Sequence, residues 1–147
     1  MAAMPLEERA IMPRETILVV DDDPAIVFFL TDALAFGGYH ALCAAGAGAL
    51  ALAQAAQPDL VLLDLLMPGV DGATVSRQLR ATATTAHIPI VAMTATPALA
   101  RQWGMVADEW LPKPFELDAL YTVVERWCRL SSGRAKVDAA ERPGPCE

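Results

Sequence analysis

The chain has 147 residues, which suits one domain with a sizeable core and leaves little room for a second. A hydrophobic content of 54% with 20% charged residues excludes an intrinsically disordered chain. The formal net charge of −7 disfavours a nucleic-acid partner, because phosphate binding needs clustered Lys and Arg, and it suits a site for a divalent cation.

Strand-like and helix-like segments alternate along the chain. The predicted strands are 17–20, 39–43, 60–64, 88–94 and 109–111. The predicted helices are one that begins at Pro24 and ends at Gly37, a small-residue helix near 47–56, one that contains Val75 and Leu79, a short one after Pro97, and a last one over 117–128. Five such strand–helix units predict an α/β fold whose parallel sheet has helices on both faces.

The two ends of the chain differ from the middle. Residues 1–15 resemble a loose leader, and residues 131–147 contain Ser, Gly, Pro and charge without apolar periodicity. We therefore predict a flexible N-terminal leader (1–15), one domain (16–130) and a flexible C-terminal tail (131–147). A signal peptide and a membrane span are both absent from the pattern, and the scattered cysteines lack metal-ligand spacing, so we expect a cytoplasmic protein with no membrane partner.

Polar side chains stand where four of the predicted strands end. Asp21 and Asp22 follow the first strand, Asp64 ends the third, Thr94 ends the fourth and Lys113 follows the fifth. Right-handed crossovers bring these strand ends to one edge of a parallel sheet, where open α/β sheets bind their ligands. Carboxylates suit Mg²⁺ and can accept a phosphoryl group, and an ammonium offsets the transferred charge. The set therefore predicts phosphoryl-transfer chemistry.

Four motifs in the same order resemble the receiver domain of the bacterial two-component response regulators. They are 20–24 (VDDDP), 59–72 (DLVLLDLLMPGVDG), 93–95 (MTA) and 111–115 (LPKPF), and the resemblance covers roughly residues 16–130. It implies a CheY-like, flavodoxin-like fold: a doubly wound five-stranded parallel sheet in the order 2-1-3-4-5.

The resemblance also implies a metal site. Asp64 would be the phosphoryl acceptor and, with Asp22 and the backbone carbonyl of Leu66, would bind Mg²⁺ directly. Asp21 would act mainly through a coordinated water. A structural alternative remains for Asp64, which could be a helix cap at the end of a strand.

Three further positions carry roles that the resemblance implies. Lys113 would pair with Asp64 and then with the phosphoryl group, and the Lys113–Pro114 bond would be cis. Thr94 would hydrogen-bond a phosphoryl oxygen, and Trp110 stands where the family has a switching Tyr or Phe. The alternatives are a loop hydroxyl for Thr94 and a solvated turn residue for Lys113.

The first predicted helix offers a surface for the phosphodonor. We expect its buried face to contain Ile26, Phe29, Leu30, Ala33 and Leu34. That face turns Val27 and Phe28 outward beside the acidic site, as a contact patch for a helical partner. The alternatives are scattered surface hydrophobes or a homodimer contact.

The resulting functional hypothesis is a stand-alone response regulator of a bacterial phosphorelay. It would accept a phosphoryl group on Asp64 from a histidine kinase or histidine phosphotransfer protein, in a Mg²⁺-dependent reaction, and signal to a downstream effector protein as a monomer or a phosphorylation-dependent homodimer. It would not be an enzyme beyond catalysing its own phosphorylation and dephosphorylation. The alternatives are a phosphorylation-independent interaction module and a Mg²⁺-dependent hydrolase, although no further acid or base group beside Asp64 is evident for the latter.

Overall fold

The computed structural model describes residues 15–131. The strands are β1 (Thr16–Val20), β2 (His40–Ala44), β3 (Leu60–Asp64), β4 (Ile90–Thr94) and β5 (Glu109–Pro112). The helices are α2 (Pro24–Phe36), the 3-10 turn η1 (Gly46–Gly48), α3 (Ala49–Ala56), α4 (Gly72–Ala81), α5 (Pro97–Gln102) and α6 (Leu117–Ser131). None of the helices within 15–131 combines the length and apolar character that a bilayer crossing requires.

All five predicted strands are present; the bounds of β3 match the prediction, and the ends of the other four differ from it by at most two residues. The largest difference is in β4, which was predicted from Ile88 and begins at Ile90. Pro89 has no N–H to give to the ladder, so regular pairing starts after it. The predicted leader and tail lie outside the described residues, apart from residues 15 and 131.

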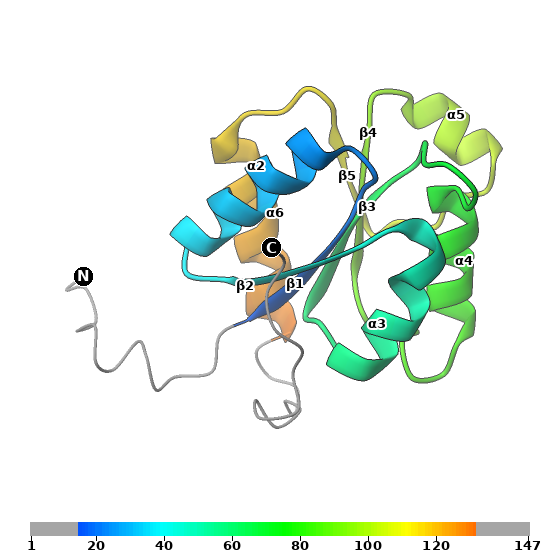
Figure 1. Cartoon of the computed structure of the whole chain (residues 1–147), viewed down its shortest axis with the longest axis horizontal. Helices are drawn as coiled ribbons and strands as arrows, with labels where there is room; N and C mark the ends of the chain where they lie inside the picture. The colour runs from blue at the N-terminus through cyan, green and yellow to red at the C-terminus, as the bar shows by residue number, and fades with distance from the viewer. Residues whose placement is uncertain (1–14, 132–147) are drawn as a thin grey trace.

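The sheet has the order β2-β1-β3-β4-β5, with every pair parallel, which confirms the predicted fold class. Figure 1 shows α2 and α6 on one side of this sheet and α3, α4 and α5 on the other. The carboxyl ends of β1 and β3 lie side by side because Val20 pairs with Leu63. The order of the strands therefore brings the polar residues after β1 and β3 to the same place.

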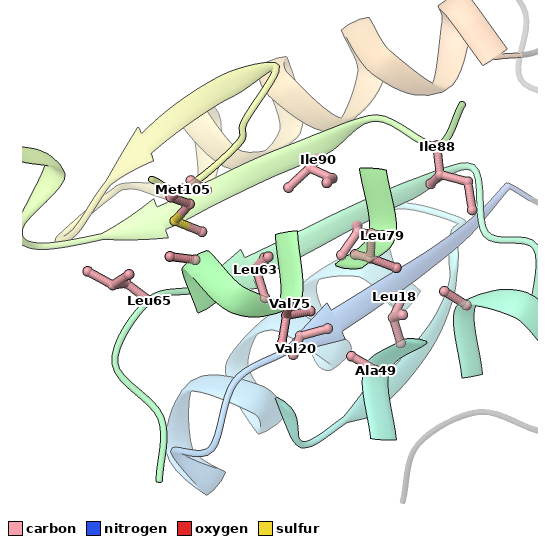
Figure 2. Packing of buried hydrophobic residues seen from close by; sticks show 14 of the residues in the cluster. Leu18, Val20, Ala49, Leu63, Leu65, Val75, Leu79, Ile88, Ile90 and Met105 are labelled. Carbon is pink, nitrogen blue, oxygen red and sulfur yellow. The ribbon is translucent and has the colours of Figure 1, made fainter. Parts of the chain in front are cut away.

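Alternating side chains of the strands build two cores. In β1, Leu18 and Val20 face the core under α3 and α4, whereas Ile17 and Val19 face the core under α2 and α6. Figure 2 shows the first of these cores, where Leu63 and Ile90 pack among side chains of the covering helices. Because both faces of the sheet are covered, every residue of β1, β3 and β4 is buried.

Two capped helices begin directly beside the strand ends that carry the acids. Asp23 caps α2 by accepting a hydrogen bond from Ala25 N at 2.9 Å. Asp71 caps α4 and accepts from Thr74 N at 2.9 Å. Gly72 then packs so closely on β3 that an added Cβ would lie 1.9 Å from the backbone oxygen of Asp64. These contacts fix the loops around the edge of the sheet.

Candidate functional site

Three carboxylates gather at the carboxyl edge of β1 and β3. One oxygen each of Asp21, Asp22 and Asp64 can be chosen so that all three lie within 4.8 Å of one another. Asp21 and Asp64 are buried, and Asp22 is exposed. Three acids at this distance repel one another, and hard oxygen ligands are those that Mg²⁺ prefers, so the residues present fit a divalent cation.

Lys113, which directly follows β5, is the cation of the cluster. Its Nζ donates hydrogen bonds to Asp21 Oδ2 at 3.0 Å and to Asp64 Oδ1 at 3.2 Å. The Lys113–Pro114 peptide is cis, as predicted. The bond to Asp64 was expected from the sequence, but the bond to Asp21 was not. The adjacency of β1 and β3 in the predicted strand order is the signal from which that second bond could have been inferred.

Burial and the neighbouring charges have opposing effects on the pKa values of Asp64 and Lys113. Burial raises the pKa of the Asp64 carboxyl, and the negative charge of Asp21 raises it further, while Lys113 works against both. Burial alone would lower the pKa of Lys113. The hydrogen bond to Asp21 and the charges of both acids outweigh that effect, so its pKa lies above the usual value. Lys113 therefore remains a cation in the site.

Leu66 lies on the loop between β3 and α4, two residues beyond Asp64. Its side chain is exposed, by 52%. With Pro68 and Trp103 it lines a groove to which Asp71, the cap of α4, also contributes. The loop thus presents an apolar side chain to solvent two residues after Asp64. The metal contact that we predicted through its backbone carbonyl stays a prediction.

Thr94 and Trp110 lie on the neighbouring strands β4 and β5. Thr94 is buried, and its hydroxyl oxygen accepts a hydrogen bond from Thr96 N at 2.9 Å and lies 3.2 Å from Thr96 Oγ1. The Trp110 ring is partly buried, and the Arg101 guanidinium carbon lies 4.9 Å from its centroid. The structure brings Thr94 to the same sheet edge as Asp64, but the switching role of the two residues stays a prediction.

The proposed contact patch on α2 is only partly exposed. Phe28 is 73% exposed and Val27 is partly buried, and the role of the two residues as a contact patch stays a prediction. Phe29 was expected in the core and is 41% exposed. The buried face of α2 consists of Leu30, Ala33 and Leu34, and Ile26, four residues before Leu30, packs against the same core. Phe29 is rotated by one residue from Leu30, so it lies at the edge of this face and is partly open to solvent.

Comparison with known proteins identifies the family. A model of the response regulator receiver domain matches residues 17–125. The chain belongs to this receiver family. It is 39% identical over 122 residues to the DNA-binding dual master transcriptional regulator RpaA of Synechocystis sp. (strain PCC 6803), covering 80% of this chain and 50% of that protein. It is 43% identical over 108 residues to the response regulator MprA of Mycolicibacterium vanbaalenii, covering 71% of this chain and 46% of that one.

Solved receiver structures have the same fold. The receiver domain of the sensor histidine kinase PA1611 from Pseudomonas aeruginosa, which has a magnesium ion coordinated in its active-site cleft, gives a TM-score of 0.74 at 27% identity and covers 80% of this chain and 99% of its own. The chemotaxis response regulator CheY4 of Vibrio cholerae gives 0.71 at 31% identity, with 78% and 99% covered. The receiver thus corresponds to complete solved chains, whereas it spans about half the length of the curated relatives that it matches.

Proposed function

We propose that this receiver accepts a phosphoryl group on Asp64. The observation that carries the proposal is the placement of the Asp64 carboxylate, which lies 3.2 Å from the Lys113 ammonium and within 4.8 Å of oxygens of Asp21 and Asp22. A nucleophilic carboxylate beside a fixed cation and two further acids has the parts that phosphoryl transfer needs. The residues that would hold Mg²⁺ are Asp21, Asp22 and Asp64, with the backbone carbonyl of Leu66.

In the proposed reaction an Asp64 carboxylate oxygen attacks the phosphorus of a phosphohistidine. The new O–P bond forms as the N–P bond of the donor breaks, and the leaving imidazole keeps the electron pair and takes up a proton. Lys113 neutralises charge on the transferred oxygens, and the Thr94 hydroxyl donates to one of them. Mg²⁺ held by the three carboxylates would supply further positive charge at this site. Hydrolysis of the acyl phosphate by water returns Asp64 to its free form.

The donor is a histidine kinase or a histidine phosphotransfer protein. We propose that it docks on α2 around Phe28, because this exposed aromatic residue lies near the end of the helix that begins at Asp23, beside the acidic cluster. The neighbouring Val27 is partly buried, so only part of its side chain is available to the donor. A helical partner can cover an aromatic side chain at this position while its histidine reaches Asp64.

We propose that the receiver signals through protein–protein contacts in the bacterial cytoplasm, without contacting nucleic acid or membrane itself. The net charge of −7 supports the first exclusion, and the similarity to the chemotaxis response regulator CheY4, of which this chain covers 99%, supports signalling as a response regulator. The downstream partner is an effector protein, and the receiver acts as a monomer or as a homodimer that forms on phosphorylation. Gel filtration of the 147-residue chain with and without phosphodonor distinguishes these two states.

The deciding experiment is intact-mass analysis after incubation with Mg²⁺ and acetyl phosphate, followed by peptide mapping. We expect the mass of one phosphoryl group on the peptide that contains Asp64, and its loss in Asp64→Asn. Asp32→Asn, which changes an exposed acid on α2, is the matched control and keeps the label. Equal labelling of the wild type and Asp64→Asn contradicts the proposal. No labelling of the folded wild type, with an effector that still binds, indicates instead an interaction module that works without phosphorylation.

A further inference from the structure

The helix α5 is too short to keep its place unaided. It contains only the six residues Pro97–Gln102, whereas isolated helices below about 12–15 residues are marginal in water. Its position therefore depends on contacts with the rest of the fold. On its inner side Ala100 is buried in the core shared with α3 and α4. Leu99, which is partly buried, packs against the same core, and Arg101 makes the contact of α5 with β5.

The N-terminal end of α5 is connected to the sheet edge that carries Asp64. Thr96, the residue before the helix, donates its backbone N–H to Thr94 Oγ1 at 2.9 Å. Thr94 ends β4, and the preceding residue, Met93, pairs directly with Asp64 on β3. Thr94, whose hydroxyl accepts from Thr96, therefore stands one residue beyond the position that pairs with Asp64 on the neighbouring strand.

Arg101 connects α5 to β5 from the other side. Its guanidinium carbon lies 4.9 Å from the centroid of the Trp110 ring, within the range of a cation–π contact. Trp110 itself packs against the core on that side of the sheet. It also stands on the strand that leads to Lys113, whose ammonium contacts Asp64. Arg101 therefore links α5, which follows Thr94, to β5, which leads to Lys113.

We propose that Arg101 is a positioning residue that holds α5 against β5 through Trp110 and so favours the unmodified conformation of the receiver. This inference rests on the proposed phosphorylation of Asp64. A phosphoryl group adds negative charge and acceptor oxygens, and a Thr94 hydroxyl that turns toward them gives up its bond to Thr96. That exchange frees the first turn of α5, and the Arg101–Trp110 contact opposes the resulting movement. Its loss reduces the cost of reaching the modified conformation.

The restraint can be tested first without any phosphoryl chemistry, by hydrogen exchange of the unmodified protein. The relevant amides are those of Ala100, Trp103 and Met105, which donate to Thr96 O, Leu99 O and Ala100 O. Arg101→Met should speed their exchange about two- to fivefold, from the ordinary strength of an exposed cation–π contact. Arg101→Lys should give an intermediate rate. Gln102→Met, the neighbouring exposed position on the same helix, is the matched control and should leave the rates unchanged.

The second measurement is the apparent affinity of the Mg²⁺-loaded protein for beryllium fluoride, which imitates the phosphoryl group on a carboxylate. Arg101→Met should bind about two- to fivefold more tightly than the wild type, and Gln102→Met should not differ. In a Trp110→Leu background, Arg101→Met should have no further effect, because the partner ring is gone. Equal affinities of the wild type and Arg101→Met, or an effect that persists without Trp110, would overturn the assignment.

The two measurements separate this inference from the proposed function. A wild type that neither binds beryllium fluoride nor becomes labelled at Asp64 refutes phosphorylation and the coupling to it. If labelling at Asp64 is normal but exchange in α5 is the same in Arg101→Met and the wild type, phosphorylation stands and the role of Arg101 is refuted.

Discussion

Asp21 accepts a hydrogen bond from Lys113 Nζ at 3.0 Å, slightly shorter than the 3.2 Å bond from the same ammonium to Asp64. The Asp21 side chain is only 1% exposed, and its partners are this ammonium at Oδ2 and the backbone N–H of Asp23, which donates to Oδ1 at 3.0 Å. One cation therefore compensates two neighbouring acids of the unmodified chain. Lys113 has a structural role in addition to its proposed role in phosphoryl transfer.

The first prediction concerns this structural role. Lys113→Met should lower the free energy of unfolding by about 1–3 kcal/mol in the presence of EDTA, because it leaves Asp21 and Asp64 without a counter-charge. Saturating Mg²⁺ should recover much of this loss. Urea denaturation measures both values. Arg129→Met, which removes an exposed ion pair with Glu125, is the control and should cost less. An equal loss in both variants would contradict the prediction.

The second prediction tests direct coordination of Mg²⁺. A ligand that binds only the folded state stabilises it by about 2.7 kcal/mol at 100 times its dissociation constant. Asp22→Ala should remove most of this Mg²⁺-dependent stabilisation, measured as the shift in melting temperature. Asp23→Ala is a sharp control, because this adjacent acid caps α2 and lies outside the three-carboxylate cluster. It should lose about 1 kcal/mol through the missing cap and keep its response to Mg²⁺.

The third prediction concerns the support of the acidic loop. In Gly72→Ala the new Cβ would meet the Asp64 backbone oxygen at 1.9 Å, so β3 and the start of α4 must move apart. We expect a loss of about 3 kcal/mol in urea denaturation. A Cβ on Gly48 would meet no atom within 4 Å, so Gly48→Ala should change stability by less than about 0.5 kcal/mol. Similar results for the two variants would show that the loop accommodates the methyl group.

The fourth prediction is a pH dependence. Burial, followed by the nearby negative groups, raises the pKa of Tyr39 from 10.0 to about 12. Since the phenol ionises first in the unfolded chain, its contribution to stability is complete below pH 10 and disappears as the pH rises toward 12. Phenolate absorbance of the folded protein should show a component with this late midpoint that is missing in Tyr39→Phe. A Tyr39 that titrates near pH 10 would contradict it.

The fold could be predicted because hydrophobic periodicity and topology act over long segments. Apolar runs such as 60–63 mark buried strands, and the order 2-1-3-4-5 follows once the motifs of the receiver are present. The predictions of where β4 begins and of a buried Phe29 were wrong, because each of these features depends on one local detail. The first is a missing N–H, and the second is a position one residue away from the buried face of α2.

The sequence was enough to predict which residues form the site, but not which of them are hydrogen-bonded to one another. The sequence brings Asp21, Asp64 and Lys113 to one edge of the sheet, yet the pairing of Lys113 with Asp21 depends on side-chain conformations that no motif encodes. The same holds for Arg101, which has no motif around it and meets Trp110 only through the packing of α5 on β5. Such contacts between elements appear only in three dimensions.

The last prediction tests docking of the phosphodonor on α2. Phe28 and Phe36 are both exposed on this helix, by 73% and 90%, but Phe28 lies at the end near the acidic cluster and Phe36 at the opposite end. Phe28→Ser should therefore slow phosphotransfer from the cognate histidine kinase about tenfold or more, as for truncation of a central aromatic interface residue. Phe36→Ser makes the same chemical change outside the proposed interface and should transfer at the wild-type rate. Labelling by acetyl phosphate, which needs no docking, should be unchanged in both variants. If both labelling reactions fall in Phe28→Ser, the substitution has damaged the site; if Phe36→Ser slows transfer as much as Phe28→Ser, the donor binds along the whole helix and the proposed position is wrong.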